Sequence, residues 1–208
     1  MELYEIGIDE VGRGALAGPV VVAAAMLACR PTQIITELRR RQLGLVALKD
    51  SKKLSAKQRE LWYEHLSGHP KISLAVARVY PREIEKRNIS QAANLAAHRA
   101  FKKLSKNGSA ARASVFLDGG LYLSNKRWQA ANVRNAKTIV KADEKIPAVS
   151  IASIIAKVHR DRFMSKLARQ YPAYGFEVHK GYGTRRHQAA LKRSGPCEAH
   201  RKSFLKVV

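Results

Sequence analysis

Acidic residues are scarce in this chain of 208 residues, which has 16 aspartates and glutamates against 39 lysines and arginines. The formal net charge is +23, and so large a basic excess favours a polyanionic partner. Nucleic acid is the first candidate and an anionic membrane surface is the second, whereas solubility alone needs much less charge. The basic residues are spread along the whole chain, which predicts a folded face that follows a phosphate backbone rather than a basic tail.

Cysteine is also rare, with Cys29 and Cys197 as the only two. One pair in a chain of this size is not a disulfide framework, and reduced thiols are typical of cytosolic proteins. No stretch has the length of an uninterrupted apolar bilayer span. The apolar run Val20–Ala28 follows an acidic, glycine-rich segment, whereas a secretory signal has a basic start and a small-residue cleavage site. We therefore expect a soluble, cytoplasmic, monomeric protein without membrane contact.

Internal repeats, low-complexity segments and obvious linkers are absent as well. The chain is long enough to bury a core, and 46% of its residues are hydrophobic. We expect residues 1–208 to form one domain, with a small helical C-terminal portion from about residue 171. Short apolar strands mixed with helices argue for an α/β fold. The expected strands are 3–8, about 20–26, 72–76, 114–117 and 138–140.

Local signals mark the starts and ends of the expected helices. Ser55 and Gln58 have the spacing of a capping box, and Ser90 is a candidate cap for the next helix. Pro147 suits the first position of a long helix. Gly195 is the residue type favoured just beyond the end of a last helix.

The few acidic residues stand at informative places. Asp9 and Glu10 are adjacent at the end of the first strand, and Asp118 ends a central apolar strand. Asp143 precedes the long helix. Functional groups often lie where a strand meets a loop, and carboxylates that converge there would repel one another without cations. Carboxylates and water are the ligands that Mg²⁺ and Mn²⁺ favour, but the same residues could instead serve turns and a helix start, so the pattern alone leaves both interpretations open.

A series of short motifs extends over nearly the whole chain. In order they are Gly7–Gly14 (GIDEVGRG), Ala17–Val20 (AGPV), Asp50–Leu54 (DSKKL), Leu117–Gly119 (LDG), Lys141–Asp143 (KAD), Ser150–Asp161 (SIASIIAKVHRD), His179–Thr184 (HKGYGT) and His200–Phe204 (HRKSF). The ordered set is specific, and it closely resembles bacterial ribonuclease HII. Two positions depart from the family pattern: Gly120 stands where many relatives carry a polar or basic residue, and Ala142 replaces a frequent glycine.

The resemblance implies a ribonuclease H-like fold, with a mixed central β-sheet flanked by helices and a helical C-terminal segment. It implies a two-metal site for Mg²⁺ or Mn²⁺ that hydrolyses the phosphodiester on the 5′ side of a ribonucleotide, leaving a 3′-hydroxyl and a 5′-phosphate. The expected substrates are RNA–DNA hybrids and duplex DNA that contains embedded ribonucleotides. The implied catalytic and metal-binding carboxylates are Asp9, Glu10, Asp118 and Asp143.

Recognition of such a substrate requires that the enzyme sense a 2′-hydroxyl. The turn Gly12-Arg13-Gly14 can bring bare backbone close to a sugar, since glycine removes the side-chain barrier. Without the resemblance an ordinary tight turn is the favoured interpretation, and the resemblance implies that this turn and Tyr182 recognise the ribonucleotide and the junction after it. Tyr182 lies between two glycines and has room to stack on a sugar, although a tyrosine in such a place is otherwise more often a packing residue. Ser51, Lys52 and Lys53 are expected to meet backbone phosphates, which would position the duplex without reading its sequence. A solvated loop would explain these three residues equally well.

Other interpretations fit parts of the sequence. Ribonuclease HIII carries an extra N-terminal nucleic-acid-binding domain, for which a first catalytic candidate at residue 9 leaves no room. A non-catalytic basic RNA-binding or ribosome-associated protein would explain the charge but not the carboxylates at strand ends, and it should be indifferent to divalent metal. A Cys-x-x-His spacing is weak support for zinc. We therefore expect a structural role, or a place near the nucleic acid, for His179, His187, Cys197 and His200.

Overall fold

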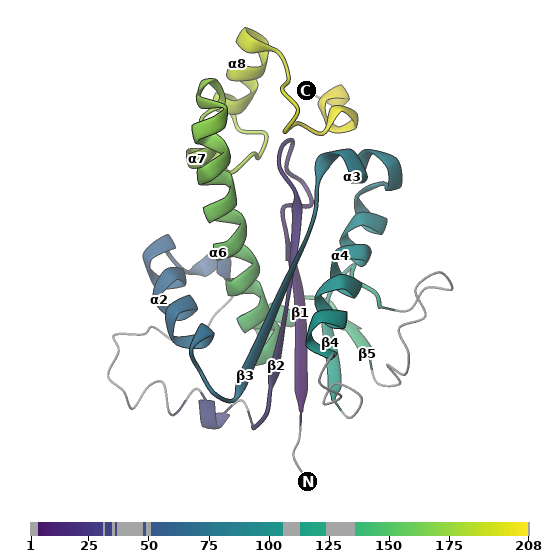
Figure 1. The fold of residues 1–208 in the computed structure, drawn as a ribbon, viewed down its shortest axis with the longest axis vertical. Coiled ribbons are helices and arrows are strands. Elements are labelled where there is room, and N and C mark those ends of the chain that lie inside the picture. Colours follow the sequence, from purple (N-terminus) through teal and green to yellow (C-terminus); the bar gives the residue numbers. More distant parts are fainter. Residues whose placement is uncertain are drawn as a thin grey trace.

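A computed structural model describes residues 4–30, 32–34, 36, 48, 51–105, 113–123 and 136–207. Within these ranges five strands form one mixed sheet in the order β3-β2-β1-β4-β5 (Figure 1). The strands are β1 (Glu5–Val11), β2 (Val20–Leu27), β3 (Ile72–Val79), β4 (Ser114–Asp118) and β5 (Ala136–Ile139). β1, β2 and β3 are antiparallel neighbours, whereas β4 and β5 run parallel to β1. The expected α/β fold with a mixed sheet is confirmed.

Helices cover both faces of this sheet. They are α2 (Ala56–Ser67), α3 (Pro81–Arg87), α4 (Ile89–Leu104), α5 (Ala142–Lys145), α6 (Pro147–Gln170), α7 (Phe176–His179) and α8 (Arg185–Ser194). Short 3-10 turns η1, η4 and η5 lie at Ser51–Lys53, Pro172–Tyr174 and Lys202–Val207. Figure 1 shows α6 and α2 on one side of the strands and α4 on the other. None of the helices in the described ranges is long and apolar enough to cross a bilayer.

β2 is buried along its whole length because both of its faces meet a helix layer. Val20, Val22 and their even-numbered neighbours join the core under α4, whereas Ala23 and Ala25 join the core under α6 and α2. On β1, a Cβ atom at Gly7 would lie only 2.1 Å from the backbone carbon of Ala148. Only glycine fits there, so α6 lies directly against the middle of β1 and brings its side chains close to the end of that strand.

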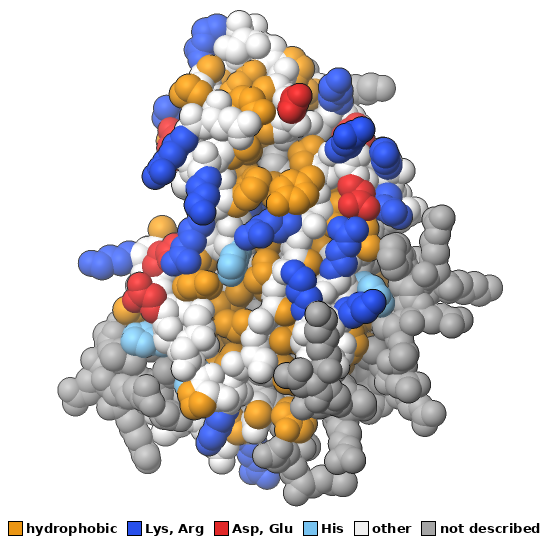
Figure 2. All heavy atoms as spheres, in the orientation of Figure 1, with side chains coloured by type: hydrophobic (Ala, Val, Ile, Leu, Met, Phe, Trp, Pro, Cys, Tyr) orange, Lys and Arg blue, Asp and Glu red, His pale blue; other side chains and the backbone are white. Residues whose placement is uncertain are grey.

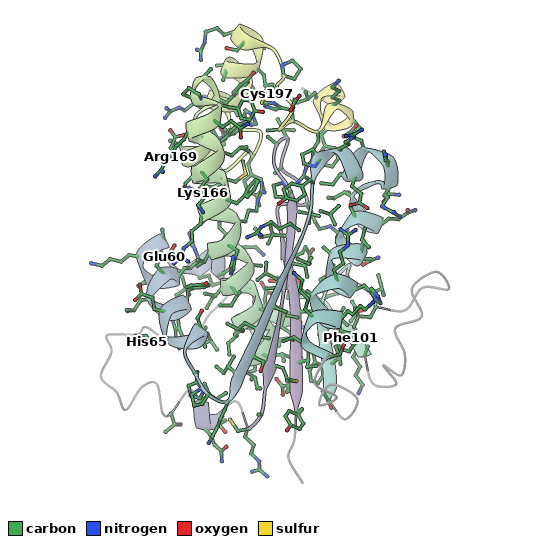
Figure 3. All side chains as sticks on the ribbon, viewed as in Figure 1. Glu60, His65, Phe101, Lys166, Arg169 and Cys197 are labelled. Atoms are coloured by element: carbon green, nitrogen blue, oxygen red, sulfur yellow. The ribbon has the colours of Figure 1, made fainter. Side chains whose placement is uncertain are left out.

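The C-terminal elements form a smaller core of their own at the far end of α6. Met164 and Ala168 of α6 pack there with residues of η4, α7 and α8, and with Ala17 from the loop after β1. The labelled Cys197 in Figure 3 lies in this C-terminal portion. Leu16 donates its backbone N–H to the carbonyl of Gly181 at 2.8 Å. The loop after β1 is therefore tied to segments more than 160 positions away in the chain.

Several local expectations are confirmed and some are wrong. Ser55 and Gln58 form the predicted capping box, and Pro147 opens α6. Ser90 does not cap α4, because the cap is Asn88, whose side chain accepts from the N–H of Gln91. β1 continues past its expected end, α3 and α5 were not expected, and β5 begins two residues earlier than expected. Asp50 lies outside the described residues.

Candidate active site

Three carboxylates meet beside the end of β4. Asp9 and Glu10 come from β1 and Asp118 ends β4, and one oxygen from each lies within 4.8 Å of the others. Adjacent residues of a strand point to opposite faces of the sheet, so Asp9 faces α6 and Glu10 faces α4. They can still converge because β4 pairs with β1 only as far as Ile8 and Leu117, which leaves the sheet open beside Asp9.

The electrostatics of this group call for a cation. Burial raises the pKa of Asp9 well above its ordinary value, and the nearby charges of Glu10 and Asp118 raise it further. Burial also raises the pKa of Glu10, although Arg13 opposes this shift. Among the described residues, Glu10 Oε2 is buried without a hydrogen-bond partner. Three carboxylates that share one neighbouring arginine within the described residues form a donor set that Mg²⁺ or Mn²⁺ would satisfy.

Asp143 lies outside this group of three, but it is tied to the group through the backbone. The N–H of Ala142 donates to Asp118 Oδ1 at 2.8 Å, which fixes the start of α5 against the end of β4. Lys141, just before it, has the left-handed φ of 55° that turns the chain into α5. The side chain of Asp143 is buried, and the Lys52 Nζ lies 3.7 Å from its Oδ2. The structure thus groups three of the four expected carboxylates and places Asp143 next to a residue that binds one of them.

Changing Asp9 to asparagine should stabilise the metal-free protein. The pKa of Asp9 in the folded state is raised above the unfolded value of about 3.9, so stability falls as the pH rises from that value through the folded-state pKa. At neutral pH each unit by which folding raises this pKa lowers the free energy of unfolding by about 1.4 kcal/mol. An uncharged amide at position 9 removes that loss. Each recovered kcal/mol should raise the melting temperature by roughly 2–4 °C.

Thermal unfolding in the presence of a chelator measures this effect. Glu64→Gln is the matched control, because Glu64 is exposed on α2 and its neutralisation should leave the melting temperature nearly unchanged. A lower melting temperature for Asp9→Asn than for the parent protein would show that the carboxylates are not a repulsive cluster.

Ser51 does not face the solvent, contrary to its expected contact with phosphates. Its side chain is buried, and its Oγ lies 2.8 Å from the Ser153 Oγ of α6. Ser153 in turn hydrogen-bonds to Asp9 and lowers the pKa of that carboxyl. Because the hydroxyl hydrogen of Ser153 goes to Asp9, Ser51 must donate to Ser153. Ser51 therefore supports a carboxylate through one intermediate hydroxyl, a role that sequence reasoning missed.

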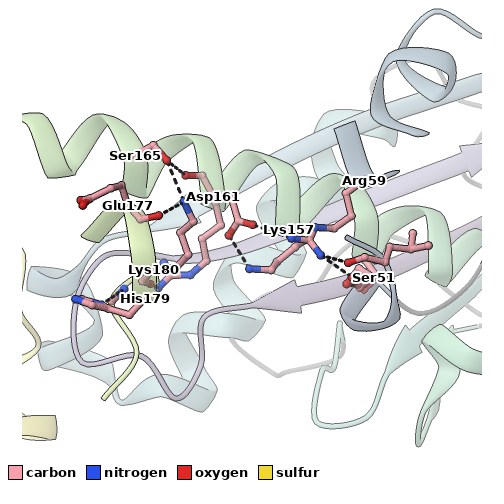
Figure 4. Close-up of polar contacts among 12 residues, drawn as sticks. Ser51, Arg59, Lys157, Asp161, Ser165, Glu177, His179 and Lys180 are labelled. Atoms are coloured by element: carbon pink, nitrogen blue, oxygen red, sulfur yellow. Dashed lines mark hydrogen bonds and ion pairs between the residues drawn. The ribbon is translucent and has the colours of Figure 1, made fainter. Parts of the chain in front are cut away.

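Arg59 fixes the segment that carries Ser51 and its two lysines. Its guanidinium donates to the Ser51 carbonyl at 3.0 Å and forms an ion pair with Asp161 at 3.3 Å. Lys157 also binds Asp161, at 2.6 Å, so α2, η1 and α6 are joined by one charged network (Figure 4). Lys180, in the His179–Thr184 motif, is held within the protein, because its Nζ donates to the Ser165 hydroxyl oxygen and to the Glu177 carbonyl.

Lys52 and Lys53 project from this anchored turn into solvent. Their side chains are 77% and 57% exposed, and the Lys53 Nζ lies 3.2 Å from Glu144 Oε1. Both lysines pair with acidic residues of α5, so they stand beside Asp143. Figure 2 shows further lysine and arginine side chains spread over the viewed face, with few acidic ones between them. This arrangement suits contact with a backbone of phosphates.

The turn Gly12-Arg13-Gly14 lies on the Glu10 side of the cluster. Arg13 contacts Glu10 Oε1 at 3.3 Å, the Gly120 carbonyl at 3.2 Å and the Ser90 Oγ at 3.2 Å. A Cβ atom at Gly120, where φ is +91°, would lie 2.7 Å from Arg13 Nη1. A larger residue at position 120 would therefore displace the end of the Arg13 side chain from its present position. A Cβ atom at Gly14 would meet nothing within 4 Å, which leaves this part of the turn open to a ligand.

Two fully buried arginines donate hydrogen bonds to backbone carbonyls of the loop after β1 and of the segment before Tyr182. Arg201 donates to the Gly18 carbonyl and, at 2.8 Å, to the Arg13 carbonyl. Arg160 donates to the carbonyls of Pro19, at 2.6 Å, and Lys180, at 2.9 Å. Burial lowers the pKa of Arg201 to about 9, and the nearby Arg160 contributes to this shift. Both arginines stood in the sequence motifs, but nothing in the pattern of those motifs indicated that they would be buried.

Tyr182 lies beside the loop after β1. The residue is partly buried and forms an isolated antiparallel bridge with Ala15. The Arg160 Cζ lies 5.7 Å from the centre of its ring. The structure thus brings Tyr182 close to the Gly12-Arg13-Gly14 turn, whose Arg13 contacts Glu10.

Comparison with known proteins gives one consistent result. The model of the ribonuclease HII family matches residues 6–207. A ribonuclease HII from Burkholderia lata is 44% identical over 201 residues, which cover 97% of this chain and 83% of that protein. Among solved structures, ribonuclease HII of Archaeoglobus fulgidus, determined in a complex with PCNA, is similar with a TM-score of 0.72 at 27% identity, over 98% of this chain and 95% of that one. Ribonuclease H2 from Pyrococcus horikoshii gives a TM-score of 0.69 at 28% identity, over 97% and 93% of the two chains.

Proposed function

The chain belongs to the ribonuclease HII family and is a nuclease, and from this premise we propose that it hydrolyses the phosphodiester on the 5′ side of a ribonucleotide. The proposed substrates are RNA–DNA hybrids and duplex DNA with embedded ribonucleotides, and the proposed products carry a 3′-hydroxyl and a 5′-phosphate. The observation that carries the proposal is the convergence of Asp9, Glu10 and Asp118 within 4.8 Å in a strongly basic chain.

The proposed metal site takes two Mg²⁺ or Mn²⁺ ions. Asp9, Glu10 and Asp118 would hold them, with Asp143 as the fourth ligand from the start of α5. Bound there, the ions would supply an activated water and would stabilise the leaving oxygen of an in-line displacement. Two observations support this assignment: Glu10 Oε2 is buried without a hydrogen-bond partner among the described residues, and burial together with the neighbouring carboxylates raises the pKa of Asp9.

The protein side chains around the metal ligands have separate tasks. Ser153 holds the Asp9 carboxylate by a hydrogen bond, and Ser51 holds Ser153. The N–H of Ala142 holds Asp118. Arg13 pairs with Glu10 and keeps that side chain on the α4 side of the cluster. Such support keeps reacting groups in position before the substrate arrives, which is where much of the rate enhancement of an enzyme originates.

Ribonucleotide recognition is proposed for the Gly12-Arg13-Gly14 turn and Tyr182. The open space at Gly14 allows the backbone to approach a 2′-hydroxyl, the group that distinguishes RNA from DNA. The bridge between Ala15 and Tyr182 sets the tyrosine beside that turn, where its ring can stack on the neighbouring sugar. We also propose a cytoplasmic, monomeric enzyme. Neither Cys29 nor Cys197 forms a disulfide, and reduced cysteines are typical of cytosolic proteins.

Lys52 and Lys53 are proposed to contact phosphates, and their replacement should weaken binding to every duplex about equally. Each contact with a phosphate displaces counterions, so the double variant Lys52→Ala/Lys53→Ala should have a salt dependence shallower by roughly one to two units of slope. Equilibrium binding to labelled duplexes over a range of salt concentrations measures this slope. An unchanged slope would assign both lysines to the solvated surface.

A double variant of equal charge controls for net charge alone. Lys71→Ala/Lys102→Ala removes two exposed lysines. Lys71 lies at the end of the sheet where β1 begins. Lys102 lies in the last turn of α4, near Phe101 in Figure 3, and a helix of 16 residues places that turn about 20 Å from Ser90 beside Arg13. The salt slope of this control should remain close to that of the parent protein.

Product analysis tests the proposed reaction. A DNA duplex with one embedded ribonucleotide, labelled at either end in separate experiments, should be cut once, on the 5′ side of the ribonucleotide. The upstream fragment should be a substrate for extension by a polymerase, which requires a 3′-hydroxyl. Cleavage on the 3′ side, or a 2′,3′-cyclic phosphate end, would overturn the proposed chemistry.

A further inference from the structure

Three buried histidines lie directly beneath the Tyr182 turn. His179 of α7 is 7% exposed, His187 of α8 is 0% exposed, and His200 from the segment before η5 is 3% exposed. The rings of His179 and His187 are stacked with centroids 4.3 Å apart, and those of His187 and His200 are 5.2 Å apart. Buried polar rings of this kind need a complete set of hydrogen bonds.

The hydrogen bonds determine which nitrogen of His187 carries its hydrogen. His187 Nδ1 lies 3.0 Å from the carbonyl oxygen of Tyr182, and a carbonyl can only accept, so Nδ1 must donate. In a neutral ring the other nitrogen, Nε2, is then an acceptor. It lies 3.0 Å from His200 Nε2, so His200 must be the donor of that bond.

The far end of the chain of bonds agrees with this assignment. A neutral His200 that donates from Nε2 has an acceptor at Nδ1, and the backbone N–H of Cys197 donates to it at 3.0 Å. His200 Nδ1 also lies 3.3 Å from the Cys197 carbonyl, but a bond to that oxygen would require the opposite tautomer of His200. Its Nε2 would then be an acceptor that faces the acceptor Nε2 of His187. The relay therefore runs from Cys197 through His200 and His187 to the Tyr182 carbonyl.

The surroundings keep both rings neutral. Burial lowers the pKa of His187 to about 4, and the neighbouring His179 and His200 contribute to this shift. Burial also lowers the pKa of His200, with a further contribution from His179. His179 is held separately, because its Nδ1 accepts from the Gly181 N–H at 3.2 Å and its Nε2 lies 2.8 Å from the Tyr174 carbonyl.

We propose that His187 is a positioning residue for Tyr182, and that His200 supports it by fixing the tautomer in which His187 donates to the Tyr182 carbonyl. The inference rests on the proposed role of Tyr182 in recognising the ribonucleotide. The Tyr182 carbonyl also accepts from the Thr184 N–H at 2.8 Å, and the neighbouring Gly181 carbonyl accepts from Leu16 and Ala17. A shift at His187 would therefore move Tyr182 relative to the loop that contains Gly12-Arg13-Gly14.

The tautomers can be observed directly in the intact protein. Histidine ring nitrogens labelled with ¹⁵N should show, at pH 7, a hydrogen on Nδ1 of His187 and on Nε2 of His200. A hydrogen on Nε2 of His187, or a positive charge on either ring, would overturn the relay.

The effect on recognition is measured as a ratio of two cleavage rates. The rate on a duplex with one embedded ribonucleotide is divided by the rate on a long RNA–DNA hybrid. His187→Leu removes the donor to the Tyr182 carbonyl and should lower this ratio roughly tenfold, a part of the loss that misplacement by about 1 Å can cause. His187→Asn should retain most of the ratio, because an amide nitrogen takes the place of Nδ1 and donates to the same carbonyl. Melting temperatures of both variants show how much of any change reflects stability.

A double variant separates positioning from general damage. In the Tyr182→Ala background His187→Leu should lower the ratio no further, since the residue that it positions is gone. An additional loss of similar size in that background, or an unchanged ratio in His187→Leu alone, would overturn the positioning role while leaving the proposed function intact. If Tyr182→Ala itself leaves the ratio unchanged, the recognition role of Tyr182 fails, and the inference about His187 fails with it.

Discussion

Replacing Asp118 with asparagine should reduce the rate of cleavage by on the order of a hundredfold to a thousandfold, the range found when one preorganised electrostatic group is lost. The fold should persist, because the amide oxygen of asparagine can still accept from the Ala142 N–H, which now binds Asp118 Oδ1 at 2.8 Å. The loss arises because one carboxylate charge leaves a group of three whose oxygens lie within 4.8 Å, so divalent metal would bind more weakly and in a different geometry.

Single-turnover rates with saturating Mg²⁺ measure this effect. Glu64→Gln, an exposed carboxylate of α2, is the matched control and should cut at the rate of the parent protein. A higher Mg²⁺ concentration should restore part of the activity of Asp118→Asn if weaker metal binding is part of the cause. An Asp118→Asn protein that folds and cuts normally would show that the carboxylate group is not the catalytic centre.

Replacing Tyr182 with alanine should harm cleavage at a single embedded ribonucleotide more than cleavage within a long RNA–DNA hybrid. In the hybrid, neighbouring 2′-hydroxyls offer other registers for productive binding, whereas a single ribonucleotide offers one. Misplacement of a reacting group by about 1 Å can cost on the order of a hundredfold in rate, so the ratio of the two rates should fall by an amount that is easily measured. An unchanged ratio would make Tyr182 a packing residue and would leave junction sensing to Gly12-Arg13-Gly14.

The phenylalanine variant separates the ring of Tyr182 from its hydroxyl. Tyr182→Phe should retain more activity than Tyr182→Ala if stacking on a sugar is the main contribution. The Arg160 Cζ lies 5.7 Å from the ring centre, and this contact survives in phenylalanine. Activity as low as that of Tyr182→Ala would assign the main contribution to a hydrogen bond of the phenolic hydroxyl.

Local features of the fold were predictable because they depend on residues close together in the chain. The capping box of Ser55 and Gln58 and the proline that opens α6 are examples. The prediction that Ser90 caps α4 was wrong because Asn88 and Ser90 are both residue types that cap helices. The local sequence does not show at which of the two the helix begins. In the structure Ser90 already lies inside α4, whereas Asn88 stands just before it with a non-helical φ of 73° and ψ of 163°.

The charged residues of the candidate site were predictable from the sequence, but the hydrogen bonds that hold them in position were not. Asp9, Glu10 and Asp118 stood out because acidic residues are few and these lie where strands of a basic chain were expected to end. The bond from Ser51 to Ser153 joins residues 102 positions apart, and the bond from Arg201 to the Arg13 carbonyl spans 188 positions. Such partners follow from the packing of α6 and the C-terminal segment against β1, which no local pattern encodes.

The most direct measurement of the central claim is the nicking of a DNA duplex that holds one ribonucleotide, followed with Mg²⁺ and after its removal by a chelator. The carboxylate cluster predicts a single cut with Mg²⁺, no cut after chelation, and recovery of cutting when Mg²⁺ or Mn²⁺ is restored. An identical duplex of DNA alone should remain intact under all three conditions. Cutting that persists after complete removal of divalent metal, or binding without any cut when metal is present, would contradict a metal-dependent nuclease centred on Asp9, Glu10 and Asp118.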